Sequence, residues 1–413
     1  MRKRFVALAL LAGPLAGMAQ LQPAIDSVVK KDQLMGISLL TYAKGRVTGT
    51  YHSGLRDYER SLPVTDSTLF RIASLSKLVT TTGLMVLYDQ HRFKLDDDVS
   101  RYLGFTLRNP NFPEVPITFR MLMSHTASLN DGDGYDRFLG DIYSTPGAIP
   151  SVKELLLPSG RYYTPNMWLA HRPGSYFTYC NANFGIIATL IERISGQRFD
   201  LYMREKILDP LGITGGYNVA EIGSIGNVAA IYRNKDGWKT QVDGYHGQRP
   251  SPRNLSGYEL GTNGFLFGPQ GGLRISALDL AKVMQLHLNG GAYAGKRLLR
   301  RSTIALMHTP QWRYNGTNGD TNGGMFQCWG LSVQLVTNTP KGDVAIEGIP
   351  LMGHAGDAYG LISGLYFEPK RGIGFVFMTN GTVGGANPGA RTGYFALEED
   401  IFRAVAPYFR SLK

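Results

Sequence analysis

The sequence predicts an α+β fold in which one antiparallel sheet is built from both ends of the chain and flanked by helices. Two observations predict it: hairpin patterns occur near each end, and most helical patterns lie between them. Residues of about 24–75 and 260–413 are expected to form the sheet part. Residues of about 76–259 are expected to form an inserted, mainly helical part.

The first nineteen residues have the pattern of a secretory signal peptide. Arg2, Lys3 and Arg4 precede the apolar stretch FVALALLAGPLAG, and Ala19 offers a small residue for cleavage. This apolar stretch is too short to span a bilayer, and no later segment approaches the roughly 20 apolar residues of a membrane helix. We therefore expect an exported protein, periplasmic or extracellular, whose single domain covers residues 20–413 and has no transmembrane segment.

Each end of the chain carries a predicted hairpin. The segment MGISLLTYAKGRVTGTYHSG predicts two strands joined at 43–45, and YGLISGLYFEP with IGFVFMTN predicts two more around 370–372. The last twenty residues have apolar side chains at helical spacing, and Pro407 is expected to kink or end that helix.

Three central helices have readable boundaries. The first begins at Ser74, and the second carries an apolar stripe from Phe184 that stops at Gly196. The third begins at Ser276, whose side chain is placed to cap the helix with Asp279 three residues later.

Composition excludes several classes of function. The net charge of +11 falls to +8 without the three basic residues of the signal, and these charges are scattered, so a nucleic-acid partner is not expected.

Two cysteines, Cys180 and Cys328, are too few for a disulfide framework, and whether they pair stays open. The chain contains no HExxH, and we expect neither a metal nor an organic cofactor. The acidic group between 131 and 141 is interpreted as a solvated loop, because its spacing does not match a calcium loop.

The stretch RIASLSK contains a serine three residues before a lysine. Positions i and i+3 of a helix share one face, so Lys77 is placed to take the proton of the Ser74 hydroxyl if burial lowers its pKa. A helix start also directs free backbone N–H groups toward an oxyanion formed at the serine. The alternative is an ordinary helix cap, and the same pattern recurs at Ser27 and Lys30.

Further motifs follow Ser74 and Lys77 in order. Tyr179-Cys180-Asn181 precedes a predicted helix, and His354-Ala355-Gly356 precedes the C-terminal hairpin. With these motifs the chain resembles the class C β-lactamase and penicillin-binding-protein-like serine hydrolases, whose pattern is S-x-x-K, Y-x-N, then K-T-G or H-x-G. ITFRMLMSHTASL, GGLRISALDLAKVM and GLYFEPKRGIGFVFMTNG resemble further segments of that family, and the similarity covers about residues 26–409.

The resemblance implies a catalytic set and a mechanism. Ser74 is expected to form an acyl-enzyme, while Lys77 and Tyr179 move protons, and the sequence leaves open which of the two is the base. By resemblance Asn181 contacts Lys77 and the substrate amide, although it is also placed to cap the helix that follows. His125 is expected to have a structural role at the end of its helix.

The H-x-G motif is expected to bind substrate. His354 stands where the family often has lysine, and with an ordinary pKa near 6.5 a histidine is only partly charged at neutral pH. We expect it to donate a hydrogen bond to the substrate; the alternative is a structural histidine. By resemblance the Asp357 N–H joins the Ser74 N–H as a second oxyanion donor, and Gly356 belongs to the same motif.

The expected function is hydrolysis of an ester, a D-amino-acid peptide or amide, or a β-lactam-like compound by an exported serine hydrolase. His354 favours an esterase or D-peptidase over an efficient β-lactamase. The alternative is a protein that binds or senses penicillin or peptidoglycan peptides with negligible turnover. The expected partner is a small-molecule or peptide substrate, such as one derived from the cell wall. Specificity is assigned to segments 130–168, with their aromatic cluster, and to a mobile loop at 314–324.

Overall fold

The structure is a computed structural model that describes residues 13–144 and 149–412. Within these residues the main sheet has nine strands in the order β10-β11-β12-β13-β14-β15-β1-β2-β3, and all neighbouring pairs are antiparallel. The strands are β1 (Gly36–Ala43), β2 (Arg46–Asp57), β3 (Leu62–Pro63), β10 (Trp312–Arg313), β11 (Cys328–Trp329), β12 (Gln334–Leu335), β13 (Met352–Ala358), β14 (Leu361–Glu368) and β15 (Ile373–Thr379).

The two predicted hairpins form the centre of this sheet. β1 turns into β2 at residues 44–45, and β14 turns into β15 at residues 369–372. β1 pairs with β15 in the register Ile37↔Thr379 to Tyr42↔Gly374, which joins the two ends of the chain. The predicted fold class, an α+β protein with an antiparallel sheet built from both termini, is therefore confirmed.

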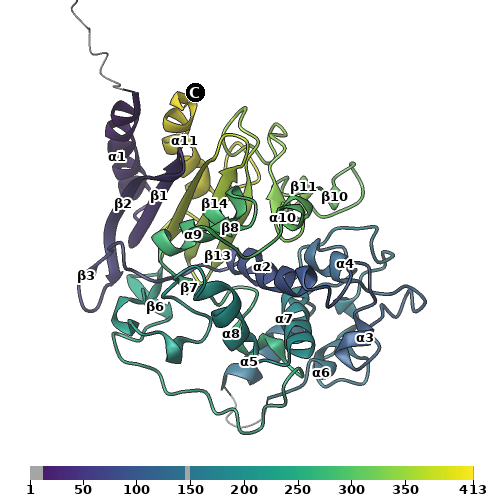
Figure 1. Cartoon of the computed structure of the whole chain (residues 1–413). Helices are drawn as coiled ribbons and strands as arrows, with labels where there is room; N and C mark the ends of the chain where they lie inside the picture. The colour runs from purple at the N-terminus through teal and green to yellow at the C-terminus, as the bar shows by residue number, and fades with distance from the viewer. Residues whose placement is uncertain (1–12, 145–148, 413) are drawn as a thin grey trace, which may run out of the picture.

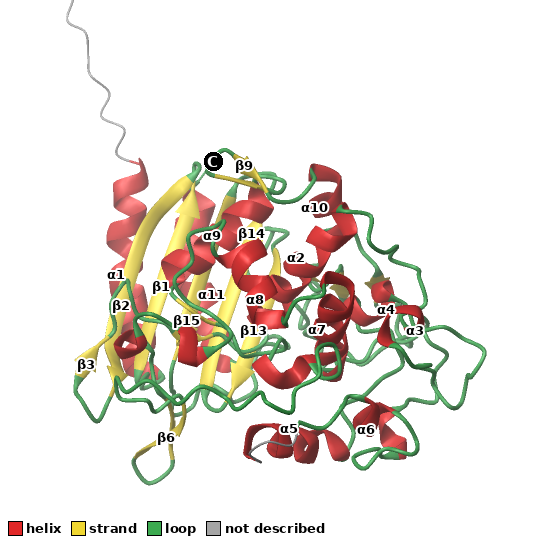
Figure 2. Cartoon of the chain, turned by 60° about the horizontal axis from the view of Figure 1, so that its bottom comes forward, coloured by secondary structure: helices red, strands yellow, loops and turns green. Residues whose placement is uncertain are grey.

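The central strands are buried on both faces because their side chains alternate between two cores. Ile37 and Leu39 of β1 contact the core formed with α1 (Gly13–Lys31) and α11 (Ala396–Ser411). Leu40 and Tyr42 contact the larger core, to which α9 (Ala277–Leu288) also belongs. Figure 2 shows the strands side by side, with α1 and α11 on one face of the sheet and α9 on the other.

The remaining helices gather beyond the α9 face, away from α1 and α11 (Figure 1). Their bounds are α2 (Leu75–Asp89), α3 (Ser100–Leu103), α4 (Phe119–Met123), α5 (Gly134–Ser144), α6 (Lys153–Leu156), α7 (Ala182–Ser195), α8 (Phe199–Met203) and α10 (Arg301–Met307). Shorter helical turns are η1 (Pro165–Met167), η2 (Arg204–Leu208), η3 (Val219–Glu221), η4 (Ile225–Asn227) and η5 (Gly264–Phe267). Small strand pairs are β4 (Phe70–Arg71) with β7 (Arg274–Ile275), β5 (Ile231–Asn234) with β6 (Trp238–Val242), and β8 (Ala292–Tyr293) with β9 (Lys296–Arg297).

The predicted helix boundaries in the middle of the chain are confirmed. Gly196 ends α7 with φ 73°, a conformation that glycine adopts without a steric penalty. The Ser276 hydroxyl accepts a hydrogen bond from the Asp279 N–H at 3.1 Å and so caps α9.

The C-terminal helix continues further than Pro407 suggested. α11 runs through this proline to Ser411, so Pro407 does not end the helix, and the alternative that it kinks the helix stays a prediction. Pro407 lies on the exposed side of α11, where the backbone carbonyl that loses its N–H partner is free to meet water.

Part of the predicted signal peptide lies outside the described residues. Residues 1–12 are not described, and α1 begins at Gly13 and continues to Lys31. Leu21, Ile25 and Val28 of α1 are buried in the core that α11 shares. Among the described helices none is long and apolar enough to cross a membrane.

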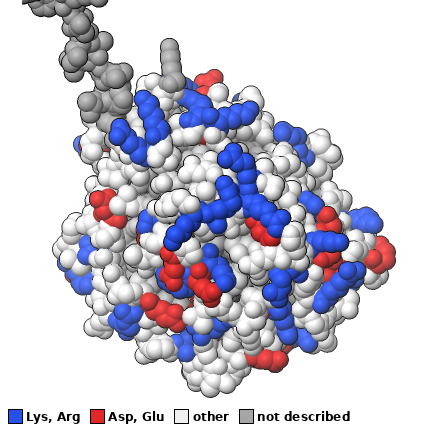
Figure 3. Space-filling view, viewed as in Figure 1, with Lys and Arg blue, Asp and Glu red and all other residues white. Residues whose placement is uncertain are grey.

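Basic side chains are spread over the surface. On the face shown in Figure 3, lysine and arginine side chains lie in several groups with acidic side chains between them. This distribution agrees with the scattered positive charge of the sequence.

Candidate active site

Ser74 lies at the start of α2, where this helix packs against both α7 and β13. The residue before it, Ala73, has φ 46°, a left-handed conformation that costs free energy for any residue except glycine. Ser74 stands at the N-cap position, yet its side chain makes no capping hydrogen bond. The hydroxyl therefore does not bond to the helix backbone and is available to other side chains. Ser27, the serine of the second SxxK pattern, is instead exposed on α1.

Lys77 is completely buried on the same helix. Its Nζ donates to Ser74 Oγ at 3.0 Å, Asn181 Oδ1 at 2.7 Å and the Gln270 carbonyl at 2.9 Å. Burial lowers the pKa of Lys77 to about 7, because removing an ammonium group from water disfavours its charged form. A large fraction of Lys77 is thus neutral near pH 7, as a base for Ser74 requires.

Tyr179 lies close enough to Ser74 to interact with its hydroxyl, and two aromatic rings are stacked against its own. The His125 ring is stacked on it with centroids 4.4 Å apart, and the Phe326 ring is stacked at 5.3 Å. Burial raises the pKa of Tyr179 above its usual value of 10. The phenol therefore stays protonated at neutral pH, and His125, expected only to serve its helix end, also positions Tyr179.

Asn181 links Lys77 to an aspartate that sequence reasoning placed in a solvated loop. Its Oδ1 accepts from Lys77, while its Nδ2 donates to Asp131 Oδ2 at 2.8 Å. Asp131 Oδ1 also accepts from the Ala182 N–H at 2.9 Å and from the Cys180 thiol at 3.3 Å. Asn181 stands at the N-cap of α7 but does not cap it through its side chain, and Asp131 takes that role.

His354 is buried on β13 and is neutral. Its Nδ1 donates to the Ala355 carbonyl at 2.6 Å, which leaves Nε2 as the unprotonated nitrogen. Burial, aided by the nearby Lys77 charge, lowers the pKa of His354 to about 3. The partial charge expected from the sequence is therefore absent at neutral pH, and its one ring hydrogen is already bound to the backbone.

Gly356 allows β13 to approach the start of α2. A β-carbon on this glycine would lie 2.4 Å from Ser363 Oγ and 2.7 Å from the Ile72 carbonyl, so a larger residue would push the two elements apart. Next to it, Asp357 pairs with Ile362 of β14. The backbone N–H and carbonyl of Ile362 bond to Thr379 of β15, so they do not bond to Asp357 of β13. In an antiparallel pair of this kind the N–H of Asp357 also points away from its partner strand, toward the edge of β13 that faces α2.

A cavity of about 450 Å³ opens over Ser74. Acidic side chains line it, namely Asp320, Asp357 and Glu398, and none of the lining residues is a lysine or an arginine. Glu398 is 1% exposed, and burial raises its pKa to about 8. The remaining lining residues are Ser74, Thr178, Tyr179, Asn181, Asn322, Met325, Phe326, His354, Ala355, Gly356 and Phe395.

The two segments to which specificity was assigned differ in position. Asp320 and Asn322 from the loop 314–324 line the cavity. From segment 130–168, Tyr162 and Trp168 are buried in the core and do not line it. Apolar burial of these rings in the helical part explains the cluster, because large aromatic side chains supply much of a core.

The two cysteines do not form a disulfide. Cys180 and Cys328 are both buried free thiols. Burial raises the pKa of each thiol, so neither is an activated nucleophile.

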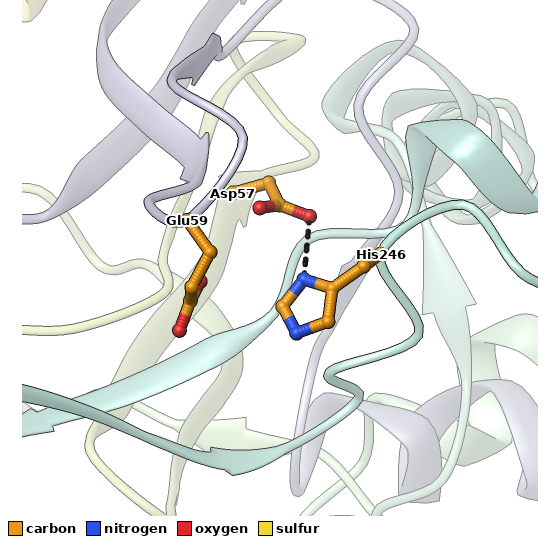
Figure 4. Close-up of side chains that lie close together, drawn as sticks. All are labelled: Asp57, Glu59 and His246. Atoms are coloured by element: carbon orange, nitrogen blue, oxygen red, sulfur yellow. Dashed lines mark hydrogen bonds and ion pairs between the residues drawn. The ribbon is translucent and has the colours of Figure 1, made fainter.

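One group of described side chains has metal-ligand composition, and it lies outside the Ser74 cavity. Asp57, Glu59 and His246 come together beyond the end of β2, as Figure 4 shows. Asp57 already accepts from the backbone N–H and the Nε of Arg60, at 2.9 and 2.7 Å. Glu59 accepts from the Tyr232 hydroxyl. The adjacent Arg60 guanidinium group disfavours a bound cation, and the Asp57 carboxylate is already hydrogen-bonded to Arg60 and His246.

Comparison with known proteins identifies the family of this chain. A family model described as Beta-lactamase matches residues 21–397. The chain belongs to the beta-lactamase family. Penicillin-binding protein 4 of Amycolatopsis lactamdurans is 23% identical to this family member over 399 residues, which cover 94% of this chain and 89% of the relative.

Solved structures of similar fold include two hydrolases. EstCE1, a hydrolase with promiscuous acyltransferase activity, has a TM-score of 0.70 and 21% identity, covering 95% of this family member and 99% of that chain. The D-amino acid amidase of Ochrobactrum anthropi SV3, complexed with L-phenylalanine, has a TM-score of 0.68 and 19% identity, with coverage of 96% and 98%. At these identities the similarity concerns the fold.

Proposed function

We propose that this beta-lactamase-family protein is an exported serine hydrolase that cleaves esters or amides through an acyl-enzyme on Ser74. The observation that carries the proposal is the buried Lys77, whose Nζ lies 3.0 Å from Ser74 Oγ and whose pKa is about 7. A base with a pKa near the working pH combines a useful neutral fraction with adequate basicity.

The geometry supports a definite order of proton transfers. Neutral Lys77 takes the Ser74 proton as Oγ attacks the substrate carbonyl, and the oxyanion is held by the Ser74 and Asp357 N–H groups. Tyr179, which is protonated and lies beside Ser74, donates a proton to the leaving group and is reprotonated from Lys77. Water then attacks the acyl carbonyl, losing its proton to the same pair, and Ser74 is released.

The charges in the cavity favour some substrates over others. Asp320 and Asp357 line it, no lining residue is a lysine or an arginine, and His354 is neutral, so no cation in the wall neutralises a carboxylate next to the scissile bond. This supports an ester or a D-amino-acid amide or peptide over a β-lactam. Two proteins of similar structure, a hydrolase with acyltransferase activity and a D-amino acid amidase, support the same classes.

Hydrolysis of p-nitrophenyl acetate by purified protein lacking residues 1–19 tests the proposal. We expect continuous release of p-nitrophenolate that falls at least about 10³-fold in Ser74→Ala, because the variant lacks the nucleophile. The matched control is Ser27→Ala, which changes the exposed serine of the second SxxK pattern. Equal turnover in Ser74→Ala would refute the proposal, and a single burst without turnover would favour a binding or sensing protein.

A further inference from the structure

A second cavity of about 470 Å³ is lined by residues that lie close in the chain to those of the catalytic cavity. Its wall includes Arg71, three residues before Ser74, and Tyr359, two residues after Asp357. The Arg71 guanidinium lies 4.9 Å from the centre of the Tyr359 ring, and its Nε donates to the Gly271 carbonyl at 3.1 Å. These two residues therefore belong to the part of the second cavity that is nearest in the chain to Ser74 and to the end of β13.

The charge of the second cavity is opposite to that of the first. Three arginines line it, Arg71, Arg253 and Arg274, against one acidic residue, Asp243. Arg274 uses that carboxylate fully, because its Nη2 and Nε donate to the two Asp243 oxygens at 2.6 and 3.0 Å. Arg71 and Arg253 form no ion pair with this carboxylate, although its charge also acts on Arg71.

Arg71 and Arg253 have no carboxylate partner among the described residues. Arg253 Nη1 donates to the Ile142 carbonyl at 2.8 Å, and its guanidinium lies 4.9 Å from the centre of the Tyr143 ring. Burial lowers the pKa of Arg253, which reflects the cost of removing a cation from water without a counter-charge. The undescribed residues 145–148 include no acidic residue in the sequence. The wall thus presents two guanidinium groups that an anion would neutralise.

We propose that this second cavity, here named the arginine cavity, binds a carboxylate at the far end of the acyl group that Ser74 attacks. Guanidinium groups bind carboxylates in two-point contacts, and a partly buried site strengthens them. The assignment to the acyl side follows from Tyr179, the proposed donor to the leaving group. Tyr179 lies on the wall with Asp320 and Phe326, and none of these three lines the arginine cavity.

The proposal rests on the Ser74 hydrolase mechanism and narrows its substrates to acyl donors with a distal carboxylate. A carboxylate next to the scissile bond meets the acidic cavity, whereas one several atoms away reaches the arginines beyond Arg71. The two cavities therefore select for the position of the negative charge as well as for its presence.

A paired series of activated esters tests the proposal. The mono-p-nitrophenyl esters of adipic, suberic and sebacic acids are compared with the same esters whose distal carboxylate is capped as a methyl ester. We expect kcat/KM to favour the free carboxylate at least tenfold for one or more chain lengths. In Arg253→Gln this ratio should fall at least fivefold, and Arg253→Lys, which keeps the charge, should restore part of it.

Arg249→Gln is the matched control. Arg249 is a nearby exposed arginine that donates to the Ala220 and Gly223 carbonyls and does not line the arginine cavity. In Arg249→Gln the ratio of kcat/KM between the free and the capped esters should equal that of the wild type. A wild-type ratio near one at every length, with turnover that still depends on Ser74, would overturn the carboxylate assignment and leave the hydrolase intact. Turnover that survives Ser74→Ala would instead refute the hydrolase mechanism.

Binding provides a readout that does not need turnover. Monomethyl suberate is titrated into Ser74→Ala by calorimetry, and we expect binding that weakens at least fivefold when Arg253→Gln is added. No binding, or the same affinity in both proteins, would contradict the proposal. Equal affinity for inorganic phosphate or acetate would show a site for free anions and overturn the acyl-donor assignment.

Discussion

At the scale of single residues, the identity of the base follows from burial. Lys77 and Tyr179 both contact Ser74, and both are removed from water. Desolvation disfavours the charged form of each, so it lowers the pKa of the lysine and raises that of the tyrosine. Neutral lysine is the form that accepts a proton and neutral tyrosine is the form that donates one, so burial assigns opposite roles to the two neighbours.

The pH dependence of hydrolysis tests this assignment. We expect kcat/KM for p-nitrophenyl acetate to rise with pH and level off above an apparent pKa of about 7, because only deprotonated Lys77 accepts the Ser74 proton. The measurement is a rate profile from about pH 5 to 9 at constant ionic strength. A profile that keeps rising toward pH 10 would point to Tyr179 as the base.

Asp131 should change the pH at which the rate rises, although it does not contact the substrate. Its negative charge raises the pKa of Lys77, against the larger effect of burial, so Asp131→Asn should move the rising limb to lower pH. The control is Asp133→Asn in the same loop, where the carboxylate accepts only from Asn166 among the residues that the structure describes. If Asp131→Asn lowers the rate but leaves the apparent pKa of the pH–rate profile unchanged, Asp131 acts only by holding Asn181 and Ala182.

At the scale of elements, the helix that follows the Tyr179 motif depends on close packing. Gly185 of α7 faces η5, and a β-carbon at this position would lie 2.0 Å from two ring atoms of Phe265. Glycine is normally unfavourable inside a helix by about 1 kcal/mol, so its presence here reflects the approach of the ring. Glycine thus lowers the helix propensity of α7 but allows the helix to pack closely against η5.

Gly185→Ala should therefore destabilise the protein, although alanine favours helices. We expect the free energy of unfolding in urea to fall by about 1–3 kcal/mol, the usual cost of overpacking a core. Gly223→Ala is the control, because nothing lies within 4 Å of a β-carbon at that position. An unchanged or increased stability of Gly185→Ala would mean that the Phe265 ring moves aside at little cost.

At the scale of the whole molecule, several histidines are buried in uncharged form. His125 and His354 lie beside the catalytic residues, and His287 bonds His308 at 3.1 Å in the core between α9 and α10. Desolvation lowers the pKa of each below 6.5. These histidines therefore become protonated at a lower pH in the folded protein than in the unfolded chain.

Stability should consequently fall as the pH falls below about 6.5. The unfolded histidines bind protons there while the folded ones do not, so stability is complete above about pH 6.5 and is lost toward lower pH. For one fully buried histidine the loss by pH 5 is about 2 kcal/mol. Thermal melts from pH 7.5 to 4.5 measure the effect, and His287→Gln should reduce the pH dependence. A Tm that stays constant or rises between pH 7 and pH 5 would contradict this prediction.

The sequence by itself determined the elements and the order of the motifs. Turn residues and side-chain periodicity act over a few residues, so the hairpins at 36–57 and 361–379 and the boundaries of α7 and α9 were readable. Spacing within one turn of helix likewise placed Ser74 and Lys77 on one face. The sequence contained the full set Ser74, Lys77, Tyr179 and Asn181, which the structure brings together.

Only the tertiary structure decided the surroundings of those residues. Asp131 and Asn181 are 50 residues apart, and the ring of Phe326 reaches Tyr179 from a distant loop, so no local pattern predicts either contact. The neutral state of His354, the pKa of Lys77 and the opposite charges of the two cavities depend on burial and on neighbours from separate elements. Desolvation and charge pairing act through space, and the folded chain alone sets those distances.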